Sequence, residues 1–189
     1  EPLPNLEFKF VTANTLIGLE AEKQQVAFDF GETIDLQNQL QQLRSNYLQA
    51  SPQEKENLKL QFEKLQTQIY KNELKAGGQN KRAQQLAAWK PFSNEGSTWF
   101  DPDWMFGVEK FDVVIGNPPY GAKTSTTQKN YFKERHFSAK TNKKENLKGN
   151  TDTYVVFSEL GVDLLVENGI LCYIVPLSMT SSESNTAFH

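Results

Sequence analysis

The sequence of 189 residues offers very little thiol or imidazole chemistry. It has a single cysteine, Cys172, which excludes an internal disulfide bond. The two histidines, His136 and His189, do not combine with Cys172 into a spacing typical of a zinc site. We therefore expect no bound metal and a reducing, cytoplasmic environment. Because Cys172 lies in an apolar run, we expect its side chain in the core and not in a nucleophilic role.

Long apolar stretches and a recognisable start are also missing. No run of 18 or more apolar residues occurs, so the sequence predicts no helix that spans a membrane. The chain begins Glu-Pro-Leu-Pro, without an initiator methionine and without the charged and apolar pattern of a signal peptide. We therefore expect an internal piece of a longer polypeptide, of a size that suits one domain.

A net charge of -3 argues against a protein that is basic throughout, but the charge is uneven. Residues 121–150 carry eight cations and two anions, a local surplus of six positive charges. The cations are Lys123, Lys129, Lys133, Arg135, Lys140, Lys143, Lys144 and Lys148. Two interpretations of this basic loop stay open: a solvated segment without fixed structure, or a segment that contacts nucleic-acid phosphates. The second interpretation nominates Lys123, Lys129, Lys133 and Arg135 as contacts.

Residues 35–75 predict a hairpin of two antiparallel helices. Apolar side chains recur at spacings of four, three and four residues in two successive runs. They are Leu36, Leu40, Leu43 and Tyr47, then Leu58, Phe62, Leu65 and Ile69. The segment from Ser51 to Glu54 is a capping box with proline at the first helical position, so it predicts the start of the second helix. We interpret the hairpin as an inserted structural arm.

The rest of the chain predicts strands that alternate with helices. Residues 6–11 alternate apolar and polar side chains, and residues 111–115 form a short β-branched run, so both predict strands. Residues 153–167 have helical spacing, Asn168-Gly169 is a typical helix end, and residues 170–175 predict a second buried strand. A strand, a crossover and a strand indicate an α/β fold with a mainly parallel sheet.

The region between the hairpin and the β-branched run is rich in aromatic residues. A short helix is predicted over residues 81–89, followed by Trp89, Phe92, Trp99, Phe100, Trp104 and Phe106 among prolines and glycines. These rings suit either core packing under a loop or a surface on which bases stack, and we favour core packing.

The chemistry is concentrated where the β-branched run stops, at Asn117-Pro118-Pro119-Tyr120. The two prolines fix their own φ angles and bias the residue before each of them toward extended geometry, so the segment is rigid. Ligands of open parallel sheets bind at the carboxyl ends of strands. The Asn117 side-chain oxygen and the Pro118 carbonyl could each accept one N–H of an exocyclic amino group. Tyr120 could stack on the ring of a base that is flipped out of its duplex.

Residues 111–120, which read FDVVIGNPPY, resemble the catalytic motif of amino-directed methyltransferases that act on DNA adenine. Residues 152–157, DTYVVF, are similar to the helix that follows this motif in the same family, and residues 8–18, FKFVTANTLIG, are a weaker match. With its long insertions, the chain particularly resembles large bacterial enzymes that combine restriction and modification in one polypeptide.

The resemblance implies a partial Rossmann-like class I methyltransferase domain over residues 1–189, with the helical hairpin as an insertion. It implies methyl transfer from S-adenosyl-L-methionine (AdoMet) to the N6 amino group of adenine in double-stranded DNA, as part of a restriction-modification system. The catalytic residues would be Asn117, Pro118, Pro119 and Tyr120, and Asn14 with Thr15 would contact the cofactor.

One departure concerns the cofactor. The glycine-rich AdoMet loop of the family would lie before the first matched segment, and no G-x-G occurs in this chain. We therefore expect these residues by themselves to bind AdoMet weakly or not at all and to be inactive.

Two alternatives remain. The same motif serves methyltransferases of protein glutamine and of rRNA guanine, since an amide nitrogen needs the same acceptors. A non-enzymatic interaction module built on the helical hairpin is the other alternative.

Overall fold

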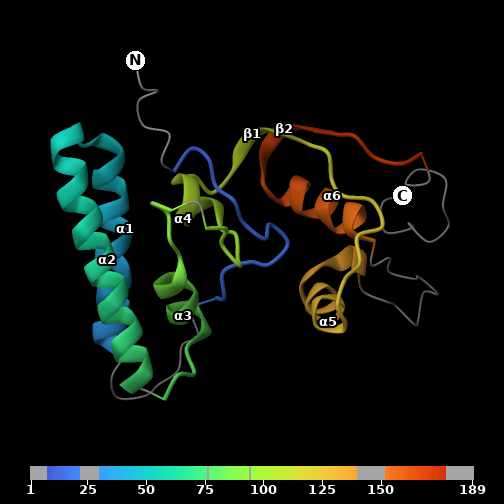
Figure 1. Cartoon of the computed structure of the whole chain (residues 1–189). Helices are drawn as coiled ribbons and strands as arrows, with labels where there is room; N and C mark the ends of the chain where they lie inside the picture. Colours follow the sequence, from blue (N-terminus) through green and yellow to red (C-terminus); the bar gives the residue numbers. More distant parts are fainter. Residues whose placement is uncertain (1–7, 22–29, 76, 94, 140–151, 178–189) are drawn as a thin grey trace. The chain divides into compact units, whose positions relative to one another are not determined.

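The computed structural model describes residues 8–21, 30–75, 77–93, 95–139 and 152–177 (Figure 1). The chain divides into two compact units, Glu1–Val108 and Glu109–His189, and each is described by itself. Together the described residues form a mixed α/β structure, as the sequence predicts at this level of detail.

The first unit is helical where the apolar spacing predicts helices. Its elements are α1 (Phe30–Gln49), α2 (Pro52–Lys75), α3 (Lys81–Ala88) and α4 (Pro102–Phe106). Helices α1 and α2 run side by side (Figure 1). The Glu54 carboxylate accepts hydrogen bonds from the Ser51 backbone N–H at 2.9 Å and from the Ser51 hydroxyl at 2.7 Å. This capping interaction starts α2 immediately after the turn.

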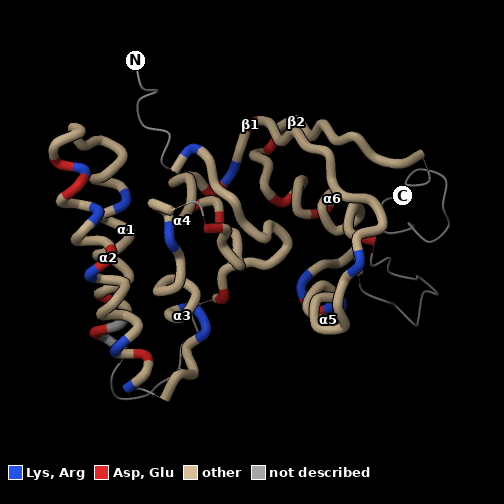
Figure 2. The backbone as a smooth tube through the Cα atoms, in the orientation of Figure 1, with Lys and Arg blue, Asp and Glu red and all other residues tan. Residues whose placement is uncertain are grey.

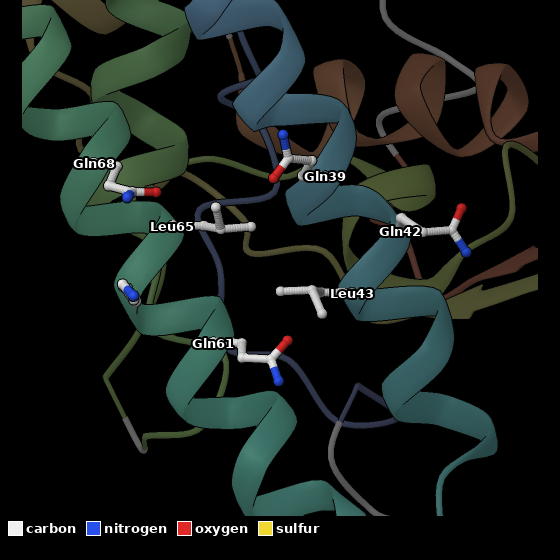
Figure 3. A pocket seen from close by; sticks show the side chains of 7 residues that line it. Gln39, Gln42, Leu43, Gln61, Leu65 and Gln68 are labelled. Carbon is white, nitrogen blue, oxygen red and sulfur yellow. The ribbon is translucent and has the colours of Figure 1, made fainter.

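A shallow groove of about 370 Å³ runs between α1 and α2. Figure 3 shows Leu43 of α1 and Leu65 of α2 pointing into it from opposite sides. The other lining side chains are polar, and four of them are glutamines. The apolar seam of the hairpin therefore reaches the surface here between amide groups.

The three tryptophans of the first unit lie in its core. Trp99 is 1% exposed, and Trp89 and Trp104 are 4% exposed. The Trp89 ring meets the Trp99 ring edge to face, with 5.7 Å between centroids. The Trp99 indole N–H donates to the Gln85 carbonyl at 3.0 Å, which satisfies its polar atom. Core packing is thus confirmed for these tryptophans, and none of them offers a surface to a base.

The strand predicted over residues 6–11 is wrong for its described part, residues 8–11, which form a turn and irregular chain. The Phe8 ring is buried against Tyr47 and Trp89, and its backbone has a φ of 60°, which lies outside the extended region. Burial of this ring therefore overrides the alternating pattern. The chain beyond it makes isolated parallel bridges instead, Ala13 to Ser97 and Gly18 to Phe100.

The second unit contains the sheet. Its elements are β1 (Phe111–Gly116), α5 (Thr126–Arg135), the 3-10 helix η1 (Phe137–Ala139), α6 (Thr153–Asp163) and β2 (Leu165–Tyr173). The strands β1 and β2 pair in parallel, and Gly116 lies opposite Tyr173 at the carboxyl ends. The parallel arrangement is the predicted one. Within the described residues the sheet has these two strands.

The helix-to-strand junction differs from the prediction. Helix α6 ends at Asp163, and Asn168-Gly169 lies inside β2 and does not end the helix. Asn168 has a φ of 65°, and the register shifts between Phe111 and Val113, so these residues form an irregularity in the pairing. Asn-Gly, which favours turns, therefore forms a bulge inside the strand and does not end the helix.

The strands are also less buried than predicted. Ile115 is 76% exposed, Ile170 is 61% exposed, and Cys172 is exposed as well. Ile115 lies opposite Cys172 in the register, so their side chains share one face of the sheet. No described element of this unit covers that face, and the predicted core position of Cys172 is therefore wrong. The buried side chains Val155 and Val156 lie on α6.

The basic loop predicted over residues 121–150 contains a helix. Ser125 and Gln128 form a reciprocal capping box, with the Ser125 hydroxyl accepting from the Gln128 N–H at 3.2 Å. This signal starts α5, so the loop prediction is wrong for residues 126–135. Residues 140–150 lie outside the described residues.

Candidate functional site

The predicted catalytic motif leaves the sheet at the carboxyl end of β1. The last strand residue is Gly116, whose carbonyl accepts from the Ile174 N–H at 3.1 Å. Asn117 and Pro119 are exposed, Pro118 is buried, and Tyr120 is 48% exposed. The segment thus presents an amide and an aromatic ring to solvent at the edge where parallel sheets bind their ligands.

Two glycines allow the end of β1 to approach its neighbours. A Cβ on Gly116 would lie 2.9 Å from Cε1 of Tyr173, and a Cβ on Gly161 would lie 2.8 Å from the Tyr173 hydroxyl. The Tyr173 ring therefore fits only because both positions lack a side chain. Burial between them raises the pKa of Tyr173.

Tyr120 is held by its hydroxyl group. The hydroxyl oxygen lies 2.7 Å from the carbonyl of Ile174 and 3.1 Å from Oδ1 of Asn117. A phenol has one hydrogen, so it donates to one of these oxygens at a time, and the shorter contact is with Ile174. The ring of Tyr120 meets that of Tyr154 edge to face, with 6.3 Å between centroids. The hydroxyl is thereby anchored while the ring stays half exposed.

The first turn of α6 contacts the same motif. The Thr153 hydroxyl donates to the Pro119 carbonyl at 2.7 Å, and Thr153 is itself 4% exposed. Sequence reasoning predicts a helix here but does not bring Thr153 or Tyr154 to the site. The two residues are more than 30 positions from Pro119 in sequence, and a hydroxyl contact across that separation leaves no signal in spacing.

The 3-10 helix η1, which directly follows α5, is fastened to α6 by a partly buried polar cluster. The Glu159 carboxylate accepts from the backbone N–H groups of Phe137 and Ser138, both at 2.7 Å, and lies 3.5 Å from Nδ1 of His136. Burial raises the pKa of Glu159, but the hydrogen bonds from Ser138 and Phe137 outweigh it and leave the pKa below its ordinary value. Burial lowers the pKa of His136, in spite of the nearby Glu159 charge.

The described cations of the basic stretch are all exposed. Lys123 precedes α5, and Lys129, Lys133 and Arg135 lie on it (Figure 2). The guanidinium of Arg135 lies 4.7 Å from the centre of the Tyr131 ring. Phe132 of the same helix is 1% exposed, and its ring lies against His136. The cations of residues 140–148 lie outside the described residues.

The predicted cofactor contacts belong to the first unit. Asn14 is exposed and Thr15 is partly buried, in a turn where the Asn14 N–H donates to the Ser97 carbonyl at 2.9 Å. The Asn14 carbonyl accepts from the Ile17 N–H at 3.1 Å, so the backbone of the turn is fixed on both sides. The Asn14 side chain is left at the surface as a hydrogen-bonding group.

The described residues hold no group of three or more His, Cys, Asp or Glu side chains that could bind a metal ion. In the same residues, no helix combines the length and the apolar character that crossing a membrane requires.

Comparison with known proteins identifies the class. Residues 30–188 match the family model of the Eco57I restriction-modification methylases, which covers most of the chain. The chain therefore belongs to the Eco57I restriction-modification methylase family. The predicted resemblance to the methyltransferase region of combined restriction-modification enzymes is confirmed.

One relative with a similar sequence is a restriction-modification protein. The chain is 34% identical over 110 residues to a putative type II restriction enzyme and methyltransferase, RM.MjaORFECS2P, from Methanocaldococcus jannaschii. The match covers 57% of this chain and 8% of that protein, so the chain spans a small part of its relative's length. No solved structure matches the chain.

Proposed function

We propose that this chain supplies the base-binding site of a methyltransferase that transfers a methyl group from AdoMet to the N6 amino group of a flipped adenine in DNA. The observation that carries the proposal is the exposed Asn117 amide beside the half-exposed Tyr120 ring, on a double-proline segment at a strand end. Membership of a restriction-modification methylase family supports double-stranded DNA as the substrate.

The acceptors suit a poorly nucleophilic amine. The lone pair of the adenine amino nitrogen is delocalised into the ring, and hydrogen bonds from both N–H groups to fixed oxygens favour the tetrahedral nitrogen of the transition state. The Asn117 side-chain oxygen and the Pro118 carbonyl take these roles. An amide oxygen has two lone pairs, so Asn117 can accept from the substrate while Tyr120 remains 3.1 Å away.

Tyr120 supplies the stacking surface. Its hydroxyl contacts with Ile174 and Asn117 fix the direction of the ring, and about half of the side chain is open to solvent. A flipped base gains roughly 1–3 kcal/mol from stacking on such a ring. That gain offsets part of the cost of removing the base from the duplex.

The residues of the first unit are compatible with the cofactor. AdoMet, when bound, supplies the methyl group. The exposed Asn14 amide, on a turn whose backbone is fixed by Ser97 and Ile17, can hydrogen-bond the edge of the cofactor's adenine, with Thr15 beside it. We further propose that the two parallel strands belong to a Rossmann-like sheet, and that the chain by itself is inactive because it lacks a glycine-rich loop.

Helix α5 supplies contacts to the DNA backbone. Lys129, Lys133 and Arg135 are exposed on a helix that Phe132 and the Glu159 cluster hold against the unit, and Lys123 precedes it. Cations on a fixed element can replace the counterions of phosphate groups.

The test is methyl transfer by the complete gene product and its Asn117→Ala variant. Radiolabelled AdoMet is offered with DNA, with rRNA and with a glutamine-bearing protein. We expect label in DNA alone and a fall of about 100-fold or more with Asn117→Ala, since one lost transition-state acceptor costs roughly that much. Asn46→Ala, which removes an exposed asparagine of α1, is the matched control and should leave the rate unchanged.

Each other outcome points to an alternative. Label in rRNA or in the protein would favour the methyltransferases of those substrates. Equal rates for Asn117→Ala and the unsubstituted protein would mean that Asn117 is no acceptor. Absence of transfer to every substrate would favour an interaction module.

A further inference from the structure

From the Asn117 Cα to the Tyr120 Cα, the backbone has one torsion angle that its own sequence leaves free. The pyrrolidine rings fix φ of Pro118 and Pro119. The residue before a proline is restricted to extended ψ values, which covers ψ of Asn117 and of Pro118. Pro119 is followed by a tyrosine, so its ψ angle has no such restriction.

The ψ angle of Pro119 sets where its carbonyl points. The peptide that joins Pro119 to Tyr120 is planar, so the same angle also sets the position of the Tyr120 Cα. The Thr153 hydroxyl donates to that carbonyl at 2.7 Å. A hydrogen bond from a side chain that is 4% exposed, on the first turn of an eleven-residue helix, holds the carbonyl in one direction.

Helix α6 adds a second contact from the neighbouring residue. The Tyr154 ring, 6% exposed, meets the Tyr120 ring edge to face at 82°. Thr153 thus acts on the backbone of the motif, and Tyr154 on the ring that follows it. Both residues lie in the first turn of the same helix, so they move together.

We infer that Thr153 is a positioning residue for the methyl-transfer site: its hydroxyl fixes the ψ angle of Pro119, which the prolines leave free, and so helps to align Tyr120 with the Asn117 and Pro118 acceptors. The inference rests on the proposed function. Thr153 touches neither substrate nor cofactor in this role. Its effect passes through the Pro119 carbonyl.

The experiment compares Thr153→Val with Thr153→Ser in the complete gene product. Valine keeps the shape of threonine and removes the donor, whereas serine keeps the hydroxyl and removes the methyl group. Ser158→Ala is the matched control, because it removes a buried hydroxyl of the same helix that donates to the Tyr154 carbonyl at 2.9 Å. Methyl transfer to DNA is followed for kcat and for the KM of AdoMet, and urea unfolding reports stability.

We expect Thr153→Val to lower kcat roughly tenfold, the equivalent of one hydrogen bond, with the KM of AdoMet unchanged. Thr153→Ser should restore kcat to within about twofold of the unsubstituted protein, and Ser158→Ala should leave kcat unchanged. If Thr153 had a purely structural role, Thr153→Ser and Thr153→Val would both lower the unfolding midpoint. The kcat of each variant would then fall in proportion to its loss of stability, whether or not the variant keeps the hydroxyl.

Two outcomes overturn the inference alone. They are full kcat in Thr153→Val, and a fall of roughly tenfold in the kcat of a folded Thr153→Ser. The second result stands as a test even where the valine variant does not fold. In both cases the unsubstituted protein still methylates DNA and the proposed function survives. If the unsubstituted protein and the Ser158→Ala control transfer no methyl group, the proposed function fails and the inference fails with it.

Discussion

The tryptophans of the first unit and Tyr120 of the second unit differ sharply in how far their rings are buried. In the first unit, Trp89, Trp99 and Trp104 are at most 4% exposed. The Trp89 ring packs against Trp99 and against Phe62 of the hairpin. In the second unit, Tyr120 is 48% exposed at the end of β1, although its hydroxyl is held by hydrogen bonds. The Tyr120 ring meets Tyr154 at an edge and still remains half open, so packing does not account for its exposed surface.

The difference separates residues that stabilise the fold from residues that are available for chemistry. The cost of losing a buried ring appears in the free energy of unfolding, whereas the cost of losing an exposed but oriented ring appears in function. Substitutions in the two units should therefore change different measurements.

The largest effect on stability is expected for Trp99→Ala. The indole is 1% exposed and its N–H donates to Gln85, so truncation leaves a cavity and an unpaired carbonyl. We expect a loss of about 3–5 kcal/mol in the free energy of unfolding, measured by urea denaturation of the chain. Phe10→Ala, at a position 78% exposed in the same unit, should cost less than about 0.5 kcal/mol. Similar losses for both variants would contradict the packing described here.

Tyr120→Ala should lower activity much more than stability, in contrast to Trp99→Ala. We expect a fall of roughly 10–100-fold in the kcat/KM of methyl transfer by the complete gene product, from loss of base stacking. The unfolding midpoint should change far less than with Trp99→Ala, because the ring is half exposed. Tyr120→Phe keeps the ring and loses the hydroxyl contact with Ile174, so its activity should lie between that of the unsubstituted protein and that of Tyr120→Ala. Full activity in Tyr120→Ala would contradict a stacking role for the Tyr120 ring.

A smaller effect concerns pH and the cluster that holds α5. The pKa of Glu159 is lowered in the folded chain, so its contribution is complete above the ordinary pKa of 4.5 and is lost as the pH falls through the folded pKa. The lowered pKa of His136 makes the folded chain resist protonation, so stability also declines as the pH falls below 6.5. Glu159→Gln should therefore cost about 1–2 kcal/mol at pH 7 and progressively less below pH 4.5.

Urea unfolding at a series of pH values checks this prediction. A difference between the two proteins that stays constant from neutral to acid pH would mean that the Glu159 charge contributes nothing to fastening α5.

The smallest effect is expected in the salt dependence of DNA binding. Replacement of Lys129, Lys133 and Arg135 by glutamine should reduce the slope of log affinity against log salt by up to about 2.7, since each phosphate contact contributes about 0.9. The control replaces Lys64, Lys71 and Lys75 on the exposed side of α2. Equal changes in both triple variants would show that α5 has no particular role in DNA binding.

The sequence predicted the elements that local signals define. The capping box at Ser51 placed the start of α2, and the β-branched run placed β1 beside a parallel partner. It failed where tertiary contacts decide. Burial of the Phe8 ring replaced a predicted strand with a turn, and Asn168-Gly169 became a bulge in β2. The Ser125 capping box was a readable signal for α5, but the surplus of lysines around it favoured a loop.

At the site, sequence predicted the motif and not its supports. Asn117 and Tyr120 stand in a pattern whose rigidity follows from the two prolines between them. The contacts of Thr153 with Pro119 and of Tyr120 with Ile174 join residues that are 34 and 54 positions apart. Periodicity in the sequence reports which residues share a face of one helix or strand, so it does not predict contacts between residues on different elements.

The most direct test of the account is to identify the methylated atom. DNA treated with the complete gene product and labelled AdoMet is digested to nucleosides and separated by mass. The two oxygen acceptors at Asn117 and Pro118 predict a label on an exocyclic amino group that disappears with Asn117→Ala. The resemblance of residues 111–120 to the motif of adenine methyltransferases predicts that the labelled nucleoside is N6-methyldeoxyadenosine. Label on a ring carbon of cytosine, which requires no amino-group acceptors, would contradict the central claim.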